Sequence, residues 1–260
     1  MFRLALVAAL ALFGGCATTG EGDPRDPLEP LNRKVFAFND ALDGAVARPI
    51  ATVYHDYVPG PLRTYARNFF ANIGDIFIGL NNILQGKPGD GLQDWARFVF
   101  NSTIGVFGIN DVASDMGFEK HNEDFGQTFG RWGVGEGAYL VLPFLGPSNL
   151  RDGVGQAIDI YVDPLTKARP IPVRTAAYAL RFTGNRADLL DAGRLLEEAA
   201  LDRYVFLRDA YLQRRRNLVY DGEPPRDRRQ RYEEEDDKQP EKPPVQSDKP
   251  PAQPDKPSTQ

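Results

Sequence analysis

Residues 62–84 read "LRTYARNFFANIGDIFIGLNNIL", and this stretch decides the fold class. Its apolar side chains recur every three or four residues, as on one face of an α-helix; they are Tyr65, Phe69, Ile73, Phe77, Leu80 and Leu84. Adjacent apolar pairs such as Phe69-Phe70 make this face wider than the single stripe of a helix that packs on one side. We therefore expect a helix with two apolar neighbours, ending at the "GKPG" of residues 86–89.

Polar residues interrupt every long apolar stretch in this part of the chain, so that no run of 18 apolar residues exists. The interrupting residues are Arg67, Asn68, Asn72, Asp75, Asn81, Asn82, Arg97 and Asn101. Two explanations for the wide apolar faces stay open. Either the helices are buried on two sides in a soluble bundle, or one face meets protein and another meets lipid. In the second case the helices would lie within one leaflet rather than span the bilayer.

The same periodicity predicts helices in most of the remaining chain and very little strand. Residues 26–46 carry Asp26 as a plausible N-cap and Pro27 at the first helical position, and Pro49 is expected to close this helix. Further helices are expected over residues 90–102, 150–161, 173–182, 186–199 and 202–220. We predict a mostly α fold in which the glycine-rich stretch of residues 130–147 forms a short hairpin or loop.

The N-terminus carries the features of a secretory signal peptide. A basic start at Arg3 precedes about ten apolar residues, which are too few to cross a membrane of about 30 Å, and then the sequence "LFGGC" ending at Cys16. This ending resembles a bacterial lipobox, although Phe13 stands where leucine is commoner. Cys16 would then become the first residue of an outer-membrane lipoprotein, carrying diacylglycerol and an N-acyl chain such as palmitate. The alternative is an ordinary signal peptide that leaves an unmodified thiol.

Composition divides the rest of the chain. After the expected signal peptide of residues 1–15, residues 16–25 form a short lipidated tether, and residues 26–220 form the folded domain. Residues 221–260 are rich in proline and charge and poor in apolar residues, and we expect this tail to be disordered. The net charge of −5 gives no reason to expect a nucleic-acid partner.

The glycines of "GRWGVGEGAYLVLPFLGP", residues 130–147, do not match a nucleotide-binding loop. A P-loop needs Lys and then Ser or Thr after its last glycine, whereas Ala138 and Tyr139 follow Gly137. The spacing of Gly133, Gly135 and Gly137 also misses the dinucleotide fingerprint. We expect no nucleotide at this loop.

Enzymatic and metal sites are also disfavoured. The stretch "GPSNL" at residues 146–150 lacks the second glycine of a lipase elbow. His55 has Asp56 beside it, and His121 has Glu123 and Asp124 nearby, but no nucleophile motif accompanies either pair. The chain has two histidines and one cysteine, and none of them has the spacing of a metal site. We expect neither catalysis nor a bound metal.

Three consecutive arginines, Arg214, Arg215 and Arg216, follow the last predicted amphipathic stretch. Cations near the C-terminus of a helix interact favourably with its dipole, so this cluster could simply be solvated. The other interpretation is a contact to anionic lipid or to an acidic partner.

Several stretches together resemble one family over residues 26–220. They are "DPLEPLNRKVFAFND" (26–40), "NNILQGKP" (81–88), "RFVFNSTIGVFGINDVASDMG" (97–117), "EDFGQTFGRWGVGEGAYLVLPFLGPSNLRDGVG" (123–155) and "YVDPL" (161–165). In this order they are similar to the MlaA/VacJ family of outer-membrane lipoproteins, which maintain lipid asymmetry. The proline-rich tail departs from the family pattern.

The resemblance implies a ring of amphipathic helices that lies in one membrane leaflet around a central amphipathic pore. Phospholipids misplaced in the outer leaflet would pass through it to a periplasmic carrier and then to an inner-membrane ABC transporter, with trimeric porins beside the ring. It places the family's glycine-rich hairpin on Gly133, Gly135 and Gly137, and a pore-rim position on Phe38 and Asn39. A packing role for these two stays open, as does the choice between helix contacts and pore lining for Asn68, Asn72, Asp75 and Asn101. A structural or porin-binding lipoprotein that transports nothing is the alternative function.

Overall fold

The structure is a computed structural model that describes residues 23–225, so Cys16 and nearly all of the predicted tail lie outside the described residues. By its internal contacts the chain divides into a unit that ends at Glu223 and a second that begins at Pro224. The first unit contains α2 (Glu29–Leu42), η1 (Asp43–Ala47), α3 (Arg48–Tyr57), α4 (Gly60–Leu84), α5 (Pro88–Thr103), α6 (Val112–Asp115), α7 (Phe125–Arg131), β1 (Tyr139–Leu142), β2 (Gly146–Asn149), α8 (Leu150–Val162), η2 (Pro164–Lys167), α9 (Ile171–Asp188), α10 (Leu190–Ala199) and α11 (Arg203–Val219). The prediction of a mostly α fold with one short hairpin is confirmed.

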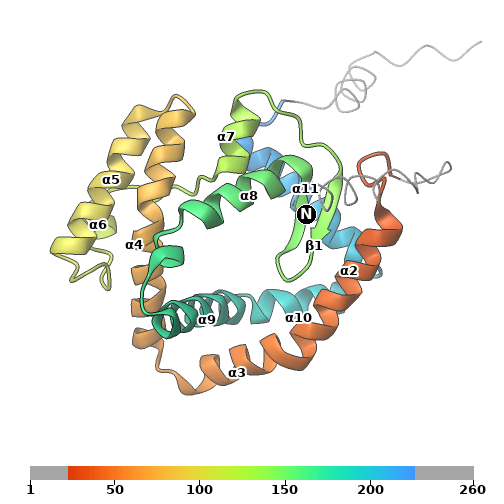
Figure 1. Ribbon diagram of the computed structural model, residues 1–260, viewed down its shortest axis with the longest axis horizontal. Helices are drawn as coiled ribbons and strands as arrows, with labels where there is room; N and C mark the ends of the chain where they lie inside the picture. The colour runs from red at the N-terminus through yellow and green to blue at the C-terminus, as the bar shows by residue number, and fades with distance from the viewer. Residues whose placement is uncertain (1–22, 226–260) are drawn as a thin grey trace, which may run out of the picture. The chain divides into compact units, whose positions relative to one another are not determined.

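Within this unit the helices follow one another around a gap between the ribbons (Figure 1). The helices α2 and α3 run along one side, α4 and α5 pack against each other on another, and the hairpin reaches inward from the side of α2. Helix α9 contacts both α3 and α4, while α11 contacts α7 and β2. This arrangement agrees with the ring that the resemblance implied.

The first helix begins at a different residue than predicted, and it does not end at Pro49 as expected. Asp26 does not cap α2, which begins at Glu29 with Leu28 at the N-cap position. Pro49 does not close the helix, because a π-helical turn, η1, leads directly into α3, where proline occupies the first turn. A proline in the first helical turn costs no hydrogen bond, since the N–H groups there have no intrahelical partner.

The later boundaries also shift. Helix α9 continues to Asp188, and the predicted helix over residues 186–199 therefore begins only at Leu190. The hairpin is formed by Tyr139–Leu142 and Gly146–Asn149, which follow the glycines instead of containing them. Its register pairs Tyr139 with Asn149 and Leu142 with Gly146.

A small polar cluster fastens the hairpin to α2 and α11. The side chain of Asn32 donates to Asp26 (2.8 Å) and to the carbonyl of Tyr139 (3.0 Å), and it accepts the N–H of Val141 (3.0 Å). Asp26 also accepts a hydrogen bond from the Tyr204 hydroxyl of α11. Tyr139, Val141, Tyr204 and Leu212 pack around these bonds as a buried apolar cluster. The residue expected to cap a helix thus joins α2 to α11, and its partner Asn32 holds the hairpin.

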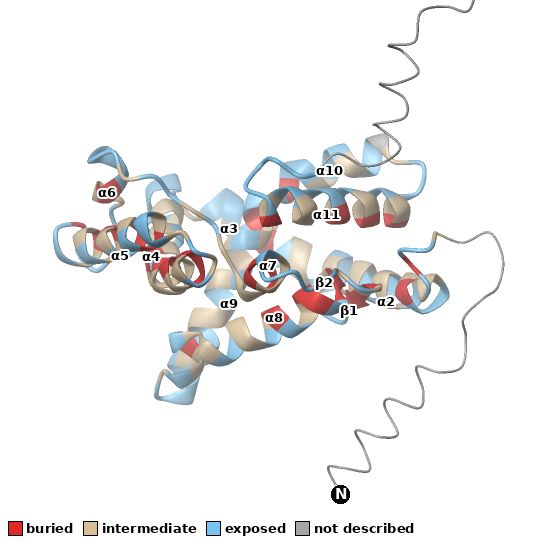
Figure 2. Cartoon of the chain, turned by 90° about the horizontal axis from the view of Figure 1, so that it is seen from above, coloured by how far each residue is buried: buried red, intermediate tan, exposed pale blue. Residues whose placement is uncertain are grey.

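Burial in the α4–α5 pair is the reverse of that in a water-surrounded bundle. The buried positions of α4 are Asn72, Asp75, Gly79, Asn81 and Asn82, and those of α5 are Gly91, Asp94, Arg97 and Asn101. Most of the exposed large side chains are apolar or aromatic, among them Leu62, Tyr65, Leu92 and Val99, although Arg67 of α4 is also exposed. Figure 2 shows buried residues in separate patches between elements. Because exposed apolar area on this scale marks a surface for protein or lipid, the pattern favours the second explanation of the wide apolar faces.

Glycines bring α4 and α5 close together. A Cβ atom on Gly79 would lie 2.6 Å from the Trp95 ring, and one on Gly91 would lie 2.6 Å from the Gly79 carbonyl oxygen. The Trp95 indole donates to the Ile76 carbonyl (3.0 Å) across the same crossing. No helix of residues 23–225 is both long enough and apolar enough to cross a bilayer.

Candidate functional site

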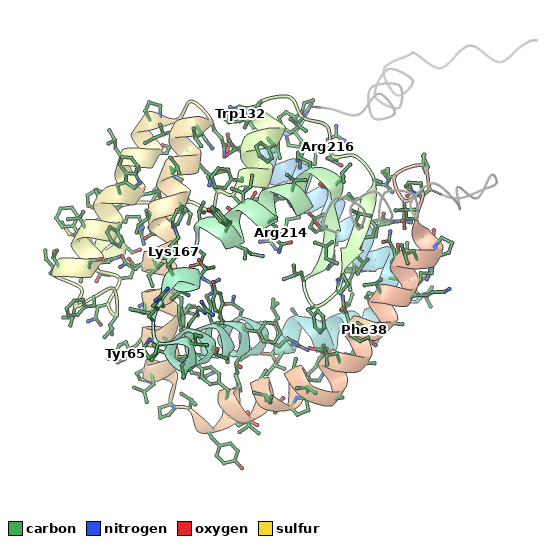
Figure 3. The ribbon with its side chains drawn as sticks, viewed as in Figure 1. Phe38, Tyr65, Trp132, Lys167, Arg214 and Arg216 are labelled. Atoms are coloured by element: carbon green, nitrogen blue, oxygen red, sulfur yellow. The ribbon has the colours of Figure 1, made fainter. Side chains whose placement is uncertain are left out.

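The hairpin tip is held by Phe38 and Asn39, the two residues of α2 that the resemblance placed at a pore rim. The Asn39 amide donates to the carbonyl of Leu142 (2.9 Å), and its oxygen accepts the N–H of Phe144 (2.9 Å). The ring of Phe38, which is labelled in Figure 3, meets that of Phe144 edge to face with centroids 5.5 Å apart. Phe144 has a φ of +65°, a conformation that is rare for a bulky residue, and this clamp holds it there.

An apolar cavity of about 560 Å³ lies beside this tip. Helix α2, η1, α3 and α9 line it together with the hairpin, and its apolar side chains are Leu42, Val46, Ile50, Phe144, Leu145 and Phe182. One polar group in its wall is an ion pair, in which Arg186 of α9 binds Asp43 through two bonds of 2.6 and 2.8 Å. A space of this composition suits hydrocarbon chains. We call it the apolar cavity.

A second cavity, of about 430 Å³, is lined by α4, β2, α8, η2, α9 and α11 and is polar on one side. Its charged groups are Glu123, Asp124, Asp152, Asp159, Asp163, Arg181 and Arg215, while Ile73, Phe77, Ile78 and Ile160 form an apolar wall. We call it the polar cavity. The elements that line the two cavities surround the gap of Figure 1.

Ion pairs fix the charges of the polar cavity. Arg215 forms two bonds with Asp124, of 2.6 and 2.8 Å, and a third with Asp152 (2.8 Å). Burial alone would raise the pKa of Asp124, but the hydrogen bonds and charge of Arg215 outweigh it and lower this pKa. Asp159 lacks such a partner, and burial, with the charge of Asp124 nearby, raises its pKa to about 6. Asp159 therefore changes charge closer to neutral pH than an ordinary aspartate does.

The structure also separates helix contacts from cavity lining among the interrupting polar residues. Asn68 donates to the Ile109 carbonyl (3.0 Å), Asn72 to Ser102 (2.9 Å), and Asn101 to Asp111 (2.9 Å). Buried Arg97 binds Asp111 at 2.8 Å and lies 3.7 Å from Asp75. All of these bonds join α4, α5 and the loop that follows α5. Asn68, Asn72, Asp75 and Asn101 thus make contacts between elements.

The other predicted residues lie in several places. Gly133 and Gly135 belong to the loop between α7 and β1, and Gly137 precedes β1 by two residues with a φ of +68°, where a Cβ would touch Leu150 at 3.0 Å. Cys16 lies outside the described residues. His121 binds Asp94 (2.9 Å) instead of the neighbouring acids, and His55 binds Asp56 (3.0 Å). No group of three or more potential metal ligands occurs among residues 23–225.

The three arginines of the cluster on α11 lie in different surroundings. Arg215 forms the ion pairs with Asp124 and Asp152 described above, so its role is structural. Arg214 is exposed and lies at the central gap, whereas Arg216 lies at the outer edge of the ring with Trp132 (Figure 3). The sequence signal that could have found the polar interior is the spacing of Asn68, Asn72, Asp75, Gly79 and Asn82, which is that of one helical face.

Comparison with known proteins gives the family. A family model described as the MlaA lipoprotein matches residues 24–218. The lipoprotein MlaA of the intermembrane phospholipid transport system of Escherichia coli K12 is 36% identical over 225 residues, covering 84% of this chain and 89% of that protein. The protein of the same name from Haemophilus influenzae is 30% identical and covers 84% of this chain and 90% of its own.

A solved structure is similar to this chain in both sequence and fold. It was described as a basis for the maintenance of bacterial outer-membrane lipid asymmetry, and it is 34% identical to this chain with a TM-score of 0.66. The match covers 75% of this chain and 98% of the other. The chain belongs to the MlaA lipoprotein family.

Proposed function

We propose that this chain is the outer-membrane lipoprotein of an intermembrane phospholipid transport system. It removes phospholipids that have reached the outer leaflet and so maintains the lipid asymmetry of the membrane. The names of its relatives support this function, since the alignments with these relatives cover most of both chains.

One observation carries the proposal: an apolar cavity and a polar cavity are both lined by elements of the same ring. A phospholipid has hydrocarbon tails and a charged headgroup, so its passage needs both environments at once. The tails pass along the apolar cavity beside the hairpin tip, and the headgroup passes along the charged groups of the polar cavity. Phe38 and Asn39, which hold the hairpin tip beside the apolar cavity, are the candidate residues for controlling this passage. Gly133, Gly135 and Gly137 line neither cavity, and they would act on the passage through the flexibility of the loop that leads into β1.

The ring lies in the periplasmic leaflet of the outer membrane. The exposed apolar side chains of α4 and α5 and their buried polar residues support this position. An acylated Cys16 adds a second membrane signal, because its diacylglycerol and N-acyl chains would insert into the same leaflet. Trimeric porins flank the ring, and a periplasmic carrier receives the lipid for an inner-membrane ABC transporter.

The decisive experiment measures outer-leaflet phospholipid in intact cells with and without this protein. A membrane-impermeant amine reagent labels phosphatidylethanolamine at the surface. We expect labelling to rise on deletion and to return to the original level when the full chain is restored. Unchanged labelling on deletion would instead support a lipoprotein that transports nothing.

A further inference from the structure

A third cavity lies between the end of α7, the glycine loop after it, the start of α8 and the end of α11. Its volume is about 250 Å³, and its charged lining residues are Arg151, Arg216 and Glu136. We call it the Arg151 pocket. A water molecule occupies about 30 Å³ of liquid, so the pocket has room for roughly eight waters, or for a phosphate group with its substituents.

The guanidinium of Arg151 is nearly buried, with 6% of the residue exposed. Its Nε donates to Asp152 (2.9 Å), and its Nη2 lies 2.9 Å from the same oxygen without the geometry of a hydrogen bond. Asp152 is also bound by Arg215, Tyr211 and Asn149, so its charge is shared among several partners. The positive charge of Arg151 is therefore only partly neutralised.

The remaining nitrogen of Arg151 faces the pocket. A Cβ atom on Gly130, which lines the pocket, would lie 3.0 Å from Nη1, so the absence of a side chain there leaves this nitrogen accessible. Nη1 forms no hydrogen bond within residues 23–225. A guanidinium nitrogen that reaches a cavity without a partner, on an arginine that is otherwise nearly buried, indicates a ligand with oxygen acceptors.

The glycine loop adds a carboxylate and free backbone donors to the lining of the pocket. Within the described chain, the Glu136 side chain has no hydrogen bond or ion pair, and the N–H groups of Gly135 and Glu136 donate to no other residue. A Cβ on Gly133 or Gly135 would meet nothing within 4 Å, so the loop leaves open space here. The pocket thus combines two guanidinium groups with one carboxylate, which matches a zwitterion more closely than a simple anion.

The surroundings place this pocket at a membrane–water interface. Trp132 is 57% exposed, Val134 50% and Tyr220 39%, and all three lie in or next to the pocket lining. Trp and Tyr side chains are enriched where the bilayer meets water. Trp132 and Arg216 lie along the same outer edge of the ring, away from the central gap (Figure 3).

We propose that the Arg151 pocket binds the headgroup of a zwitterionic phospholipid at the outer edge of the ring. Arg151 and Arg216 bind the phosphate, and Glu136 binds the ammonium group. The site goes beyond transport, because this lipid is a bound neighbour that holds the ring at the depth of the headgroups. The required chemistry is a phosphodiester with a primary amine, as in phosphoethanolamine.

The test uses the full lipoprotein in a detergent without phosphate. Its affinity for three soluble probes, glycerophosphoethanolamine, glycerophosphoglycerol and inorganic phosphate, is measured by isothermal titration calorimetry. We expect glycerophosphoethanolamine to bind most tightly. Arg216→Gln should weaken its binding tenfold or more, the usual effect of losing a charge-assisted hydrogen bond. Arg214→Gln, which removes the same charge two residues away at the central gap, should leave it unchanged.

A further variant separates the two halves of the headgroup. Glu136→Gln should weaken binding of glycerophosphoethanolamine and spare glycerophosphoglycerol. The proposal is wrong if no probe binds at millimolar concentration, or if Arg214→Gln weakens binding as much as Arg216→Gln does. It is also wrong if inorganic phosphate binds as tightly as the amine probe, since the pocket would then be a simple anion site. None of these outcomes depends on lipid transport, which the labelling experiment tests separately.

Discussion

At the scale of single residues, Asp75 is the carboxyl whose burial has a measurable consequence. It is 1% exposed, neither of its oxygens accepts a hydrogen bond, and Arg97 is 3.7 Å away. Burial raises its pKa to about 6 despite the nearby positive charges. The folded protein therefore binds this proton more tightly than the unfolded chain, whose carboxyl has a pKa of about 3.9. The free energy of unfolding should fall by on the order of 2 kcal/mol through this group as pH rises from 4 to 7.

Asp75→Asn tests this dependence, because an amide cannot titrate. We expect the difference in unfolding free energy between pH 4.5 and pH 7.5 to shrink in the variant. It can be measured by urea denaturation of the detergent-solubilised protein followed by circular dichroism. Asp115→Asn, at a solvent-exposed carboxyl on α6, should keep the original dependence. An unchanged slope in Asp75→Asn would contradict the assignment.

At the scale of elements, the hairpin depends on α2 for its position. Asn39 forms two hydrogen bonds with the tip, and a net loss of about 1–3 kcal/mol is typical when such bonds are removed. Asn39→Ala should therefore loosen the tip while leaving β1 attached through Asn32. We expect faster hydrogen exchange at residues 142–146 by mass spectrometry. Asn110→Ala, at an exposed asparagine of the loop after α5, serves as the control, and equal exchange in both variants would contradict the clamp.

Helical periodicity predicted most elements, and its errors have local physical causes. The apolar period located α4, α5 and α8 because each of them keeps one face apolar along its length. It missed the continuation past Pro49, where a proline starts a helix that a π-turn has already positioned. The N-cap assignment of Asp26 was also wrong. An aspartate can accept hydrogen bonds either at a helix start or from a buried partner, and the local sequence does not distinguish the two. Contacts between distant elements are not encoded in a local period.

At the scale of the whole folded unit, the reversed burial of α4 and α5 is what sequence reasoning left open. The apolar positions were identified correctly, but which face turned inward depended on partners far along the chain. Arg97, for example, donates to Asp111, Ser114 and the Phe118 carbonyl, all of which follow α5 in the chain. Because such bonds hold the polar side chains on the inner side, the apolar face is left to the surroundings. That outcome favours a ring in lipid over a bundle in water.

The lipid surroundings also make a prediction about the anchor. The acyl chains on Cys16 and the apolar outer faces of the ring are two membrane signals that should act jointly. Loss of either signal should therefore weaken membrane binding without abolishing it. Cys16→Ser should therefore abolish incorporation of labelled palmitate and shift part of the protein from the membrane fraction to the periplasm. Fractionation of cells expressing the variant, with the wild-type chain as the reference, measures both effects. Retained palmitate label would place the acyl chain elsewhere. Complete release without any membrane-bound remainder would show that the apolar faces contribute no binding of their own.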